Sequence, residues 1–199
     1  MDLDQLAEKI LRSGFVEIEA SGRHVHLTKE QSMTLFGHLL TPEKPLSQPG
    51  QFVARERVRV LGPRGRFDNV AVLGPERSEA QVEVSRTDAV TLGLDPPLKQ
   101  SGDTAGSPGA VLETERGSVV LDHGVIVAMR HIHLTPADAE RFHVKDGDQV
   151  ALQTTGPRGL VFSHTVIRVS EKFAPRAHLD YDEANACGFR KGDFGRILT

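Results

Sequence analysis

The residues best suited to chemistry lie in a hexapeptide that occurs twice. It reads RHVHLT at 23–28 and RHIHLT at 130–135, and the two copies hold four of the nine histidines. In an extended strand, residues i and i+2 point to the same face, so each copy presents two imidazoles side by side. Neutral imidazole is a common metal ligand. A repeated pair therefore favours metal binding over two chance pairs of surface histidines.

The elements around each copy follow the same order. An alternating strand at 15–20 precedes the first copy, and an apolar run at 125–129 precedes the second. Thr28 begins a capping-box pattern with Gln31, which predicts a helix over 29–36. In the second copy Thr135 is the cap. Both copies therefore read as strand, paired histidines and capped helix.

The duplication extends beyond the hexapeptide. Gly-Pro-Arg-Gly occurs at 62–65 and again at 156–159, and two further pairs, Phe67 with Phe162 and Gly93 with Gly188, are each 95 positions apart. The hexapeptides are 107 positions apart, and the extra 12 equal the length of the Pro-rich excursion 41–52. The sequence therefore predicts duplication of one β-rich unit.

The same offset supplies a third ligand to each pair, because Glu83 falls opposite His178 in two short extended runs. Three nitrogen or oxygen ligands leave a tetrahedral position open, which is the catalytic pattern. The alternative for Glu83 is a solvated strand residue. Such sets suit zinc, with cobalt and iron left open. The two predicted trios are His24, His26 and Glu83, and His131, His133 and His178.

The rest of the chain is predicted to be short strands, two further helices and two loops. An amphipathic helix is predicted at 2–13, where it either packs on its own protein or docks into a partner's groove. Strands are predicted at 55–61, 69–73, 81–85, 110–113, 118–121, 149–153, 161–164 and 166–169, a helix at 88–92, and loops at 41–52 and 95–109.

Composition narrows the class of protein. The 199 residues allow one large domain or two small ones, and a net charge of -3 argues against nucleic acid as the main partner. No apolar run approaches the ~20 residues of a membrane span, and charges in the first ten residues interrupt any signal-peptide pattern. The lone Cys187 is interpreted as a small buried hydrophobe rather than a reactive thiol. We expect a cytoplasmic protein.

The remaining candidates have ordinary interpretations. Four histidines lack a counterpart in the opposite half and are predicted to be surface or hydrogen-bonded side chains. The acidic run after His178 either orients that ring or forms a solvated turn. These residues are His38, His123, His143 and His164, and Asp180, Asp182 and Glu183.

Three rival functions remain open from the residues. A cupin-type iron oxygenase would use His24, His26 and Glu30, but Glu30 falls in the predicted helix and its counterpart is Ala137. A dinuclear metallohydrolase would use a bridging carboxylate, and none is evident. A binding module stabilised by metal would have closed sites with four ligands, and no fourth ligand is apparent in either half.

Six long stretches of the chain resemble one known family. They are SGRHVHLT at 21–28, LSQPGQF at 46–52, VLGPERSEAQVEVSRTD at 72–88, GSVVLDHGVIVAMRHIHLTPADA at 117–139, VKDGDQV at 144–150 and HLDYDEANACG at 178–188. The family is the propanediol-utilisation type of phosphotransacylase, the phosphate propanoyltransferase family, and the resemblance runs from about residue 16 to the C-terminus.

The resemblance implies a mainly β fold of two β-barrel domains with short capping helices, related by a pseudo-twofold axis. The expected segments are an N-terminal helix at 1–14, a central barrel at 23–128, and a second barrel at 129–199 completed by strand 15–22. It also implies an active site between the barrels with two zinc ions held by the two trios, and a phosphate-binding arginine at Arg77.

The implied reaction is acyl-CoA plus phosphate giving acyl phosphate plus CoA, with acetyl or propanoyl as the acyl group. The CoA sulfur is expected at the Glu83 site, and phosphate at the all-histidine site with Arg77 as hydrogen-bond donor. Gly22 stands where relatives often have Asn, which puts the hydrogen bonding around His24 in doubt. Cys187 replaces a usual Ala. A homodimer is expected, while packaging in a bacterial microcompartment through the short N-terminal helix stays open.

Overall fold

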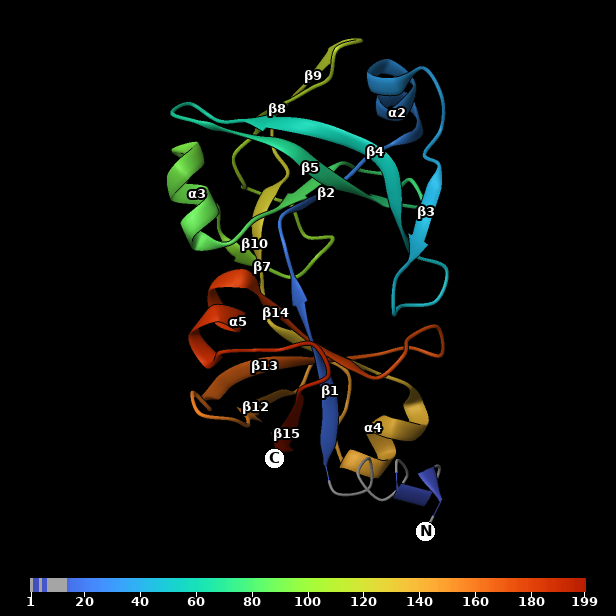
Figure 1. Cartoon of the computed structure of the whole chain (residues 1–199), viewed down its shortest axis with the longest axis vertical. Coiled ribbons are helices and arrows are strands. Elements are labelled where there is room, and N and C mark those ends of the chain that lie inside the picture. Colours follow the sequence, from blue (N-terminus) through green and yellow to red (C-terminus); the bar gives the residue numbers. More distant parts are fainter. Residues whose placement is uncertain (1, 4, 7–13) are drawn as a thin grey trace. The chain divides into compact units, whose positions relative to one another are not determined.

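The computed structural model describes residues 2, 3, 5, 6 and 14–199 (Figure 1). The amphipathic helix predicted at 2–13 lies mostly outside these residues. Its proposed role in docking therefore stays a prediction.

The chain divides into two compact units. One unit contains Met1–Ser21 and Met129–Thr199, and the other contains Gly22–Ala128. The first strand of the chain thus belongs with the C-terminal part of the sequence, as the blue strand among the orange and red ones shows (Figure 1). Each unit has its own hydrophobic core.

The first unit is a closed six-stranded barrel. Its first strand pairs in parallel with the strand that carries His178 and antiparallel with the last strand of the chain. Closure leaves no unpaired sheet edge in this unit. The barrel order is β1 (Phe15–Ser21), β14 (Arg176–Asp180), β11 (His131–Leu134), β13 (Val161–Val169), β12 (Gln149–Thr154) and β15 (Phe194–Leu198).

The second unit is a curled sheet that stays open. Its core is built of Val, Leu and Ala side chains from the strands and from the helices and loops that follow them. The order is β7 (Leu98–Lys99), β10 (Val125–Ala128), β6 (Gln81–Glu83), β2 (His24–His26), β5 (Arg66–Gly74), β4 (Phe52–Leu61), β8 (Ala110–Glu113) and β9 (Ser118–Leu121), with β3 (Pro42–Pro45) paired to β4. The mainly β fold with short helices is as predicted.

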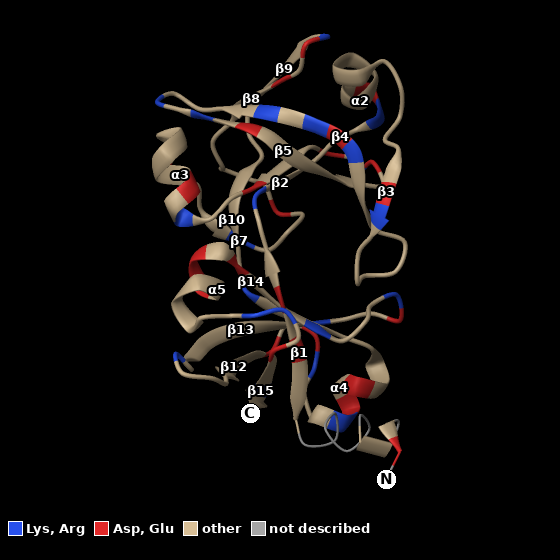
Figure 2. Ribbon diagram, viewed as in Figure 1, with Lys and Arg blue, Asp and Glu red and all other residues tan. Residues whose placement is uncertain are grey.

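Four short helices each follow a strand that bears candidate ligands. They are α2 (Lys29–Phe36), α3 (Arg86–Leu92), α4 (Pro136–Phe142) and α5 (Tyr181–Cys187). Each begins at a side-chain cap, which is Thr28, Ser85, Thr135 or Asp180. Acidic residues lie in the first turn of α5 (Figure 2), where they suit the positive end of the helix dipole. The capping box predicted at Thr28 and Gln31 is confirmed.

Two predicted loops and one predicted strand end need correction. The loop predicted at 41–52 contains the strand β3, whose prolines are tolerated because it pairs on one side only. The connection predicted at 95–109 contains the two-residue strand β7. The strand predicted at 81–85 ends at Glu83 and the next helix begins at Arg86, because Ser85 serves as the helix cap.

The two strands predicted at 161–164 and 166–169 are one strand, β13. His164 has a positive φ of 55°, and the pairing register of β13 with β12 shifts at this point. Asn69, 95 positions earlier, has a φ of 58° at a matching shift in β5. The irregularity is a β-bulge that both units share, and a bulge imitates a strand break in the sequence pattern.

None of the helices in the described part of the chain is long and apolar enough to cross a membrane. Cys187 is 4% exposed and lies in the core of the first unit, which confirms its interpretation as a small buried hydrophobe.

Candidate metal centres

The first trio is built on two antiparallel strands of the second unit. His24 and His26 lie on β2, and Glu83 on β6 is the register partner of His24. One ligand atom from each of the three side chains lies within 4.8 Å of the others, and all three residues are buried. His24 Nε2 is 3.5 Å from Glu83 Oε2.

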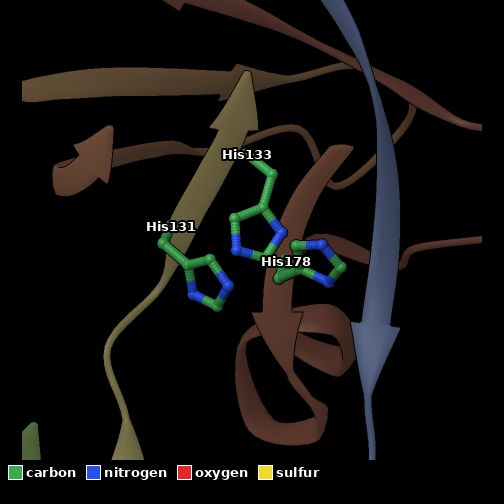
Figure 3. Close-up of side chains that lie close together, drawn as sticks. All are labelled: His131, His133 and His178. Atoms are coloured by element: carbon green, nitrogen blue, oxygen red, sulfur yellow. The ribbon is translucent and has the colours of Figure 1, made fainter. Parts of the chain in front are cut away.

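The second trio repeats this construction in the barrel. His131 and His133 lie on β11, and His178 on β14 is the register partner of His131. The three ring centroids are 4.7 to 4.9 Å apart. Figure 3 shows the three rings gathered between the two strands. Glu83 and His178, which the repeat had aligned, thus occupy equivalent register positions.

Hydrogen bonding points the first histidine of each trio toward its partners. His24 Nδ1 donates to the Gly22 carbonyl oxygen at 2.8 Å, and His131 Nδ1 donates to the Met129 carbonyl oxygen at 2.8 Å. A bond of this kind fixes the ring tautomer and leaves Nε2 as the electron-pair donor. Because the bond at His24 uses a backbone oxygen, the glycine at position 22 does not remove it.

Buried ring nitrogens also fit a metal ion. His26 Nδ1 and both ring nitrogens of His133 are buried without a hydrogen-bond partner. Such atoms are uncommon in native proteins, because burying an unpaired polar group costs ~1–3 kcal/mol. A metal ion would satisfy one such nitrogen in each trio, so the residues present fit a divalent cation.

Electrostatics keeps the second histidine of each pair neutral. Burial lowers the pKa of His26 well below its usual value, and the nearby His24 and Arg77 lower it further. Burial also lowers the pKa of His133 to about 3, with further contributions from His131 and Arg168. Both imidazoles therefore have a free electron pair near neutral pH, as metal ligation requires.

Glu83 is ionised in the first trio. Burial alone would raise the pKa of its carboxyl, but His24 and His26 lower it far below its ordinary value. For His24, burial alone would lower the pKa, because it disfavours the charged imidazolium. The charge and hydrogen bond of Glu83 outweigh burial and raise the pKa of His24. The first trio therefore contains an anionic ligand, whereas the second is made of imidazoles alone.

Sequence reasoning missed the side chains that hold Glu83. Buried Gln81 donates from Nε2 to Glu83 Oε1 at 2.6 Å and to Ser101 Oγ at 2.9 Å. The Gln81 Oε1 atom accepts from the Gly102 N–H at 2.7 Å. Glu83 lies two residues along the same strand, but the contacts of Gln81 with Ser101 and Gly102 have no sequence signal, since both residues lie in the loop predicted at 95–109.

The arginine of each hexapeptide binds the helix that follows the third ligand. Arg23 donates from Nε and Nη2 to Asp88 Oδ1 in α3, at 3.1 and 2.8 Å. Its counterpart Arg130 donates to Glu183 in α5. Asp180 caps α5. Asp180 and Glu183 therefore do not form the solvated turn that was the alternative from the sequence. The repeated arginine was a signal that could have predicted these contacts.

Arg77 lies on a pocket beside the first trio. The pocket has a volume of about 340 Å³ and is lined by His26, Arg77 and the segments 49–51 and 74–76. Arg77 Nη1 donates to Ser101 Oγ at 3.3 Å, so Ser101 links this arginine to Gln81. The predicted phosphate-binding residue thus belongs to the unit that carries Glu83.

The other histidines lie outside both trios. Glu30 is exposed on α2, which removes the ligand that a cupin-type site would need. His38 contacts Leu39 and Glu56, His123 pairs with Glu79, His164 contacts Gln149, and His143 is the C-cap of α4.

Fold and site together define a class of duplicated β protein in which each unit carries one candidate metal centre. A family model described as phosphate propanoyltransferase matches residues 17–190. The chain belongs to this family of phosphate acyltransferase enzymes.

Curated relatives support the assignment over nearly the whole chain. The phosphate propanoyltransferase of Clostridioides difficile (strain 630) is 50% identical over 98% of this chain and 95% of that protein. Proteins of the same name from Enterococcus faecalis and Thermotoga maritima are 53% and 51% identical, over 92% and 91% of this chain and 87% and 88% of those proteins.

Proposed function

We propose that this chain transfers a short acyl group, acetyl or propanoyl, between coenzyme A and phosphate. In the forward direction the thioester C–S bond breaks and a C–O bond to phosphate forms. The proton of hydrogen phosphate passes to the departing sulfur of CoA, so that acyl phosphate and the CoA thiol are released. The observation that carries the proposal is the pair of ligand trios at equivalent register positions in a chain of this family.

The trios are proposed to hold two zinc ions, one by His24, His26 and Glu83 and the other by His131, His133 and His178. When bound, such ions supply Lewis acidity, which lowers the pKa of a thiol and offsets the charge of phosphate. Cobalt or iron would suit the same ligands.

The difference between the trios suggests a division of labour. Glu83 brings a negative charge to the first trio, whereas His178 at the equivalent position brings none. The more positive second centre is therefore proposed to bind the doubly charged phosphate, and the first centre the sulfur of CoA. Both centres are proposed to serve the same reaction.

Arg77 is proposed to bind phosphate. Its guanidinium presents fixed donors that match phosphate oxygens, and charge-assisted bonds of this type are the stronger ones. The contact with Ser101 restrains the side chain. Restraint before binding lowers the entropy lost on ordering the complex.

No side chain of the protein is needed as a nucleophile. Cys187 is buried in the barrel core, and burial raises the pKa of its thiol. A raised pKa keeps the thiol protonated, and a protonated thiol is a poor nucleophile. The proposal therefore assigns acyl transfer to the two substrates directly.

The test is a CoA-release assay with acetyl-CoA and propanoyl-CoA. His26→Ala and His133→Ala should each lower phosphate-dependent release at least a thousandfold while the chain stays folded, and His164→Ala, outside both trios, should retain full activity. Full activity of either trio variant would overturn the proposal. Equal CoA release without phosphate would instead identify a hydrolase.

Arg77 has a separate test. Arg77→Ala should raise the KM for phosphate about tenfold or more, because one charge-assisted contact contributes ~1.5–3 kcal/mol. The matched control is Arg66→Ala, which removes an exposed arginine paired with Asp68. An unchanged KM for phosphate in the Arg77 variant would remove this residue from the proposed site.

The assembly of the protein is proposed from the family resemblance alone. A homodimer is expected in solution, which light scattering measures. Recovery with or without microcompartment shell proteins would decide between packaging and a free cytoplasmic enzyme.

A further inference from the structure

A carboxylate approaches the second trio from the neighbouring strand. Glu19 on β1 is the parallel register partner of His178 on β14. Its Oε2 atom lies 3.9 Å from His178 Nδ1. Figure 3 shows the blue strand β1 running alongside β14 on the side of His178.

Arg176 restrains this carboxylate. Arg176 Nε lies 3.5 Å from Glu19 Oε1, and Arg176 Nη2 lies 2.9 Å from Glu17 Oε2. The guanidinium thus spans two acids on the same face of β1, two residues apart. Glu19 therefore has a cationic neighbour on β14, two residues before His178.

The duplication shows that this arrangement is particular to the second trio. In the other unit, β10 pairs in parallel with β6, and Ile126 stands opposite Glu83 as Glu19 stands opposite His178. Ile126 is fully buried and apolar. Each trio therefore has one carboxylate close by. In the first trio this carboxylate is the candidate ligand Glu83. In the second it is Glu19, on the strand next to His178.

A second exchange accompanies the first. Gln81 and Arg176 occupy equivalent positions, opposite His26 and His133. Neutral Gln81 donates to the carboxylate of Glu83, whereas cationic Arg176 pairs with Glu19. In both units, the residue two positions before the third ligand holds the local carboxylate. The carboxylate thus lies on different strands in the two units, and in each unit a residue at the same position contacts it.

We propose that Glu19 is a positioning residue for the second metal centre. It accepts the Nδ1–H of His178, which leaves Nε2 of that ring to face the metal. This inference rests on the proposed function, because it requires a metal ion at the second trio. Carboxylates that accept from ligating histidines fix the ring tautomer and raise its basicity. The 3.9 Å separation exceeds a hydrogen bond, and contacts of this kind tighten when the site is loaded.

The experiment measures zinc affinity at the second trio alone. The full chain with His26→Ala serves as the parent, and zinc binding is measured by competition with a chelator. Adding Glu19→Gln should raise the zinc dissociation constant about tenfold, since loss of such a partner costs 10–100-fold in affinity. Adding Glu17→Gln, which removes the other acid bound by Arg176, should change it less than threefold.

Two further readouts separate positioning from a structural role. The melting temperature of the metal-free chain should be equal for the Glu19→Gln and Glu17→Gln variants. In the zinc-loaded parent, the Nδ1 proton of His178 should give a downfield resonance that moves upfield in Glu19→Gln, because an amide oxygen accepts more weakly than a carboxylate. Glu19→Asp, which keeps the charge, should recover part of the affinity.

The possible failures are distinguishable. Equal zinc affinity in the parent and in the Glu19→Gln chain would overturn the role of Glu19 and leave the metal centre intact. A parent that binds no zinc would overturn the proposed second metal centre, and this inference with it.

Discussion

The partly buried ion pair between Arg23 and Asp88 gives a prediction with a definite magnitude. Asp88 is 5% exposed and accepts two hydrogen bonds from the guanidinium, at 2.8 and 3.1 Å. Removing one partner of a buried pair costs ~3–5 kcal/mol. The Arg23 side chain is 38% exposed and regains water when its partner is lost, which lowers the expected cost. We therefore expect Asp88→Ala to reduce the free energy of unfolding by about 2–3 kcal/mol.

Calorimetry of the zinc-free chain measures this cost. For a chain of this size, 1 kcal/mol lowers the melting temperature by ~2–4 °C, so Asp88→Ala should lower it by about 4–12 °C. The control Asp68→Ala removes an exposed partner of Arg66 and should lower it by less than 2 °C.

A double-mutant cycle isolates the pair itself. Arg23→Met combined with Asp88→Ala should show a coupling free energy of at least ~1 kcal/mol. Since Arg23 directly precedes His24, both single variants should also weaken zinc binding at the first trio. A coupling below about 0.3 kcal/mol, with zinc affinity unchanged, would refute the reasoning that this pair positions the hexapeptide.

Three further predictions test the sites. Gln81→Leu should weaken zinc binding at the first trio about tenfold, because Glu83 loses its 2.6 Å donor, and equal affinity would count against that role. The pKa of His24 is raised, so protons compete more strongly there. Zinc affinity at the first trio should therefore fall as pH falls from about 8 to 6, whereas a flat profile would contradict this. Cys187→Ala should keep full acyl-transfer activity, and loss of turnover in a folded variant would reopen a thiol mechanism.

Much of the fold could be predicted because its signals are local. The caps at Thr28 and Thr135 and the alternating strand at 15–20 act within a few residues, and the structure has these elements. The bulge at His164 and the edge strand β3 could not be predicted. Both depend on a partner strand that the local pattern does not contain.

Part of the candidate site could likewise be predicted from the sequence, and part could not. The repeat offset alone aligned Glu83 with His178, because duplication preserves the register between equivalent strands. Glu19 could not be predicted, since it acts across a strand pair, and the Ser101 and Gly102 partners of Gln81 lie in a distant loop. Neither side chain is repeated in the other unit, although Gln81 and Glu83 are only two residues apart on β6.

The most direct test of the account is a zinc titration of the metal-stripped chain during the CoA-release assay. The account predicts no phosphate-dependent acyl transfer without metal, and full activity only when two equivalents of zinc are bound per chain. Full activity in the metal-free chain, or a plateau at one equivalent, would contradict the claim that both trios hold metals needed for the reaction.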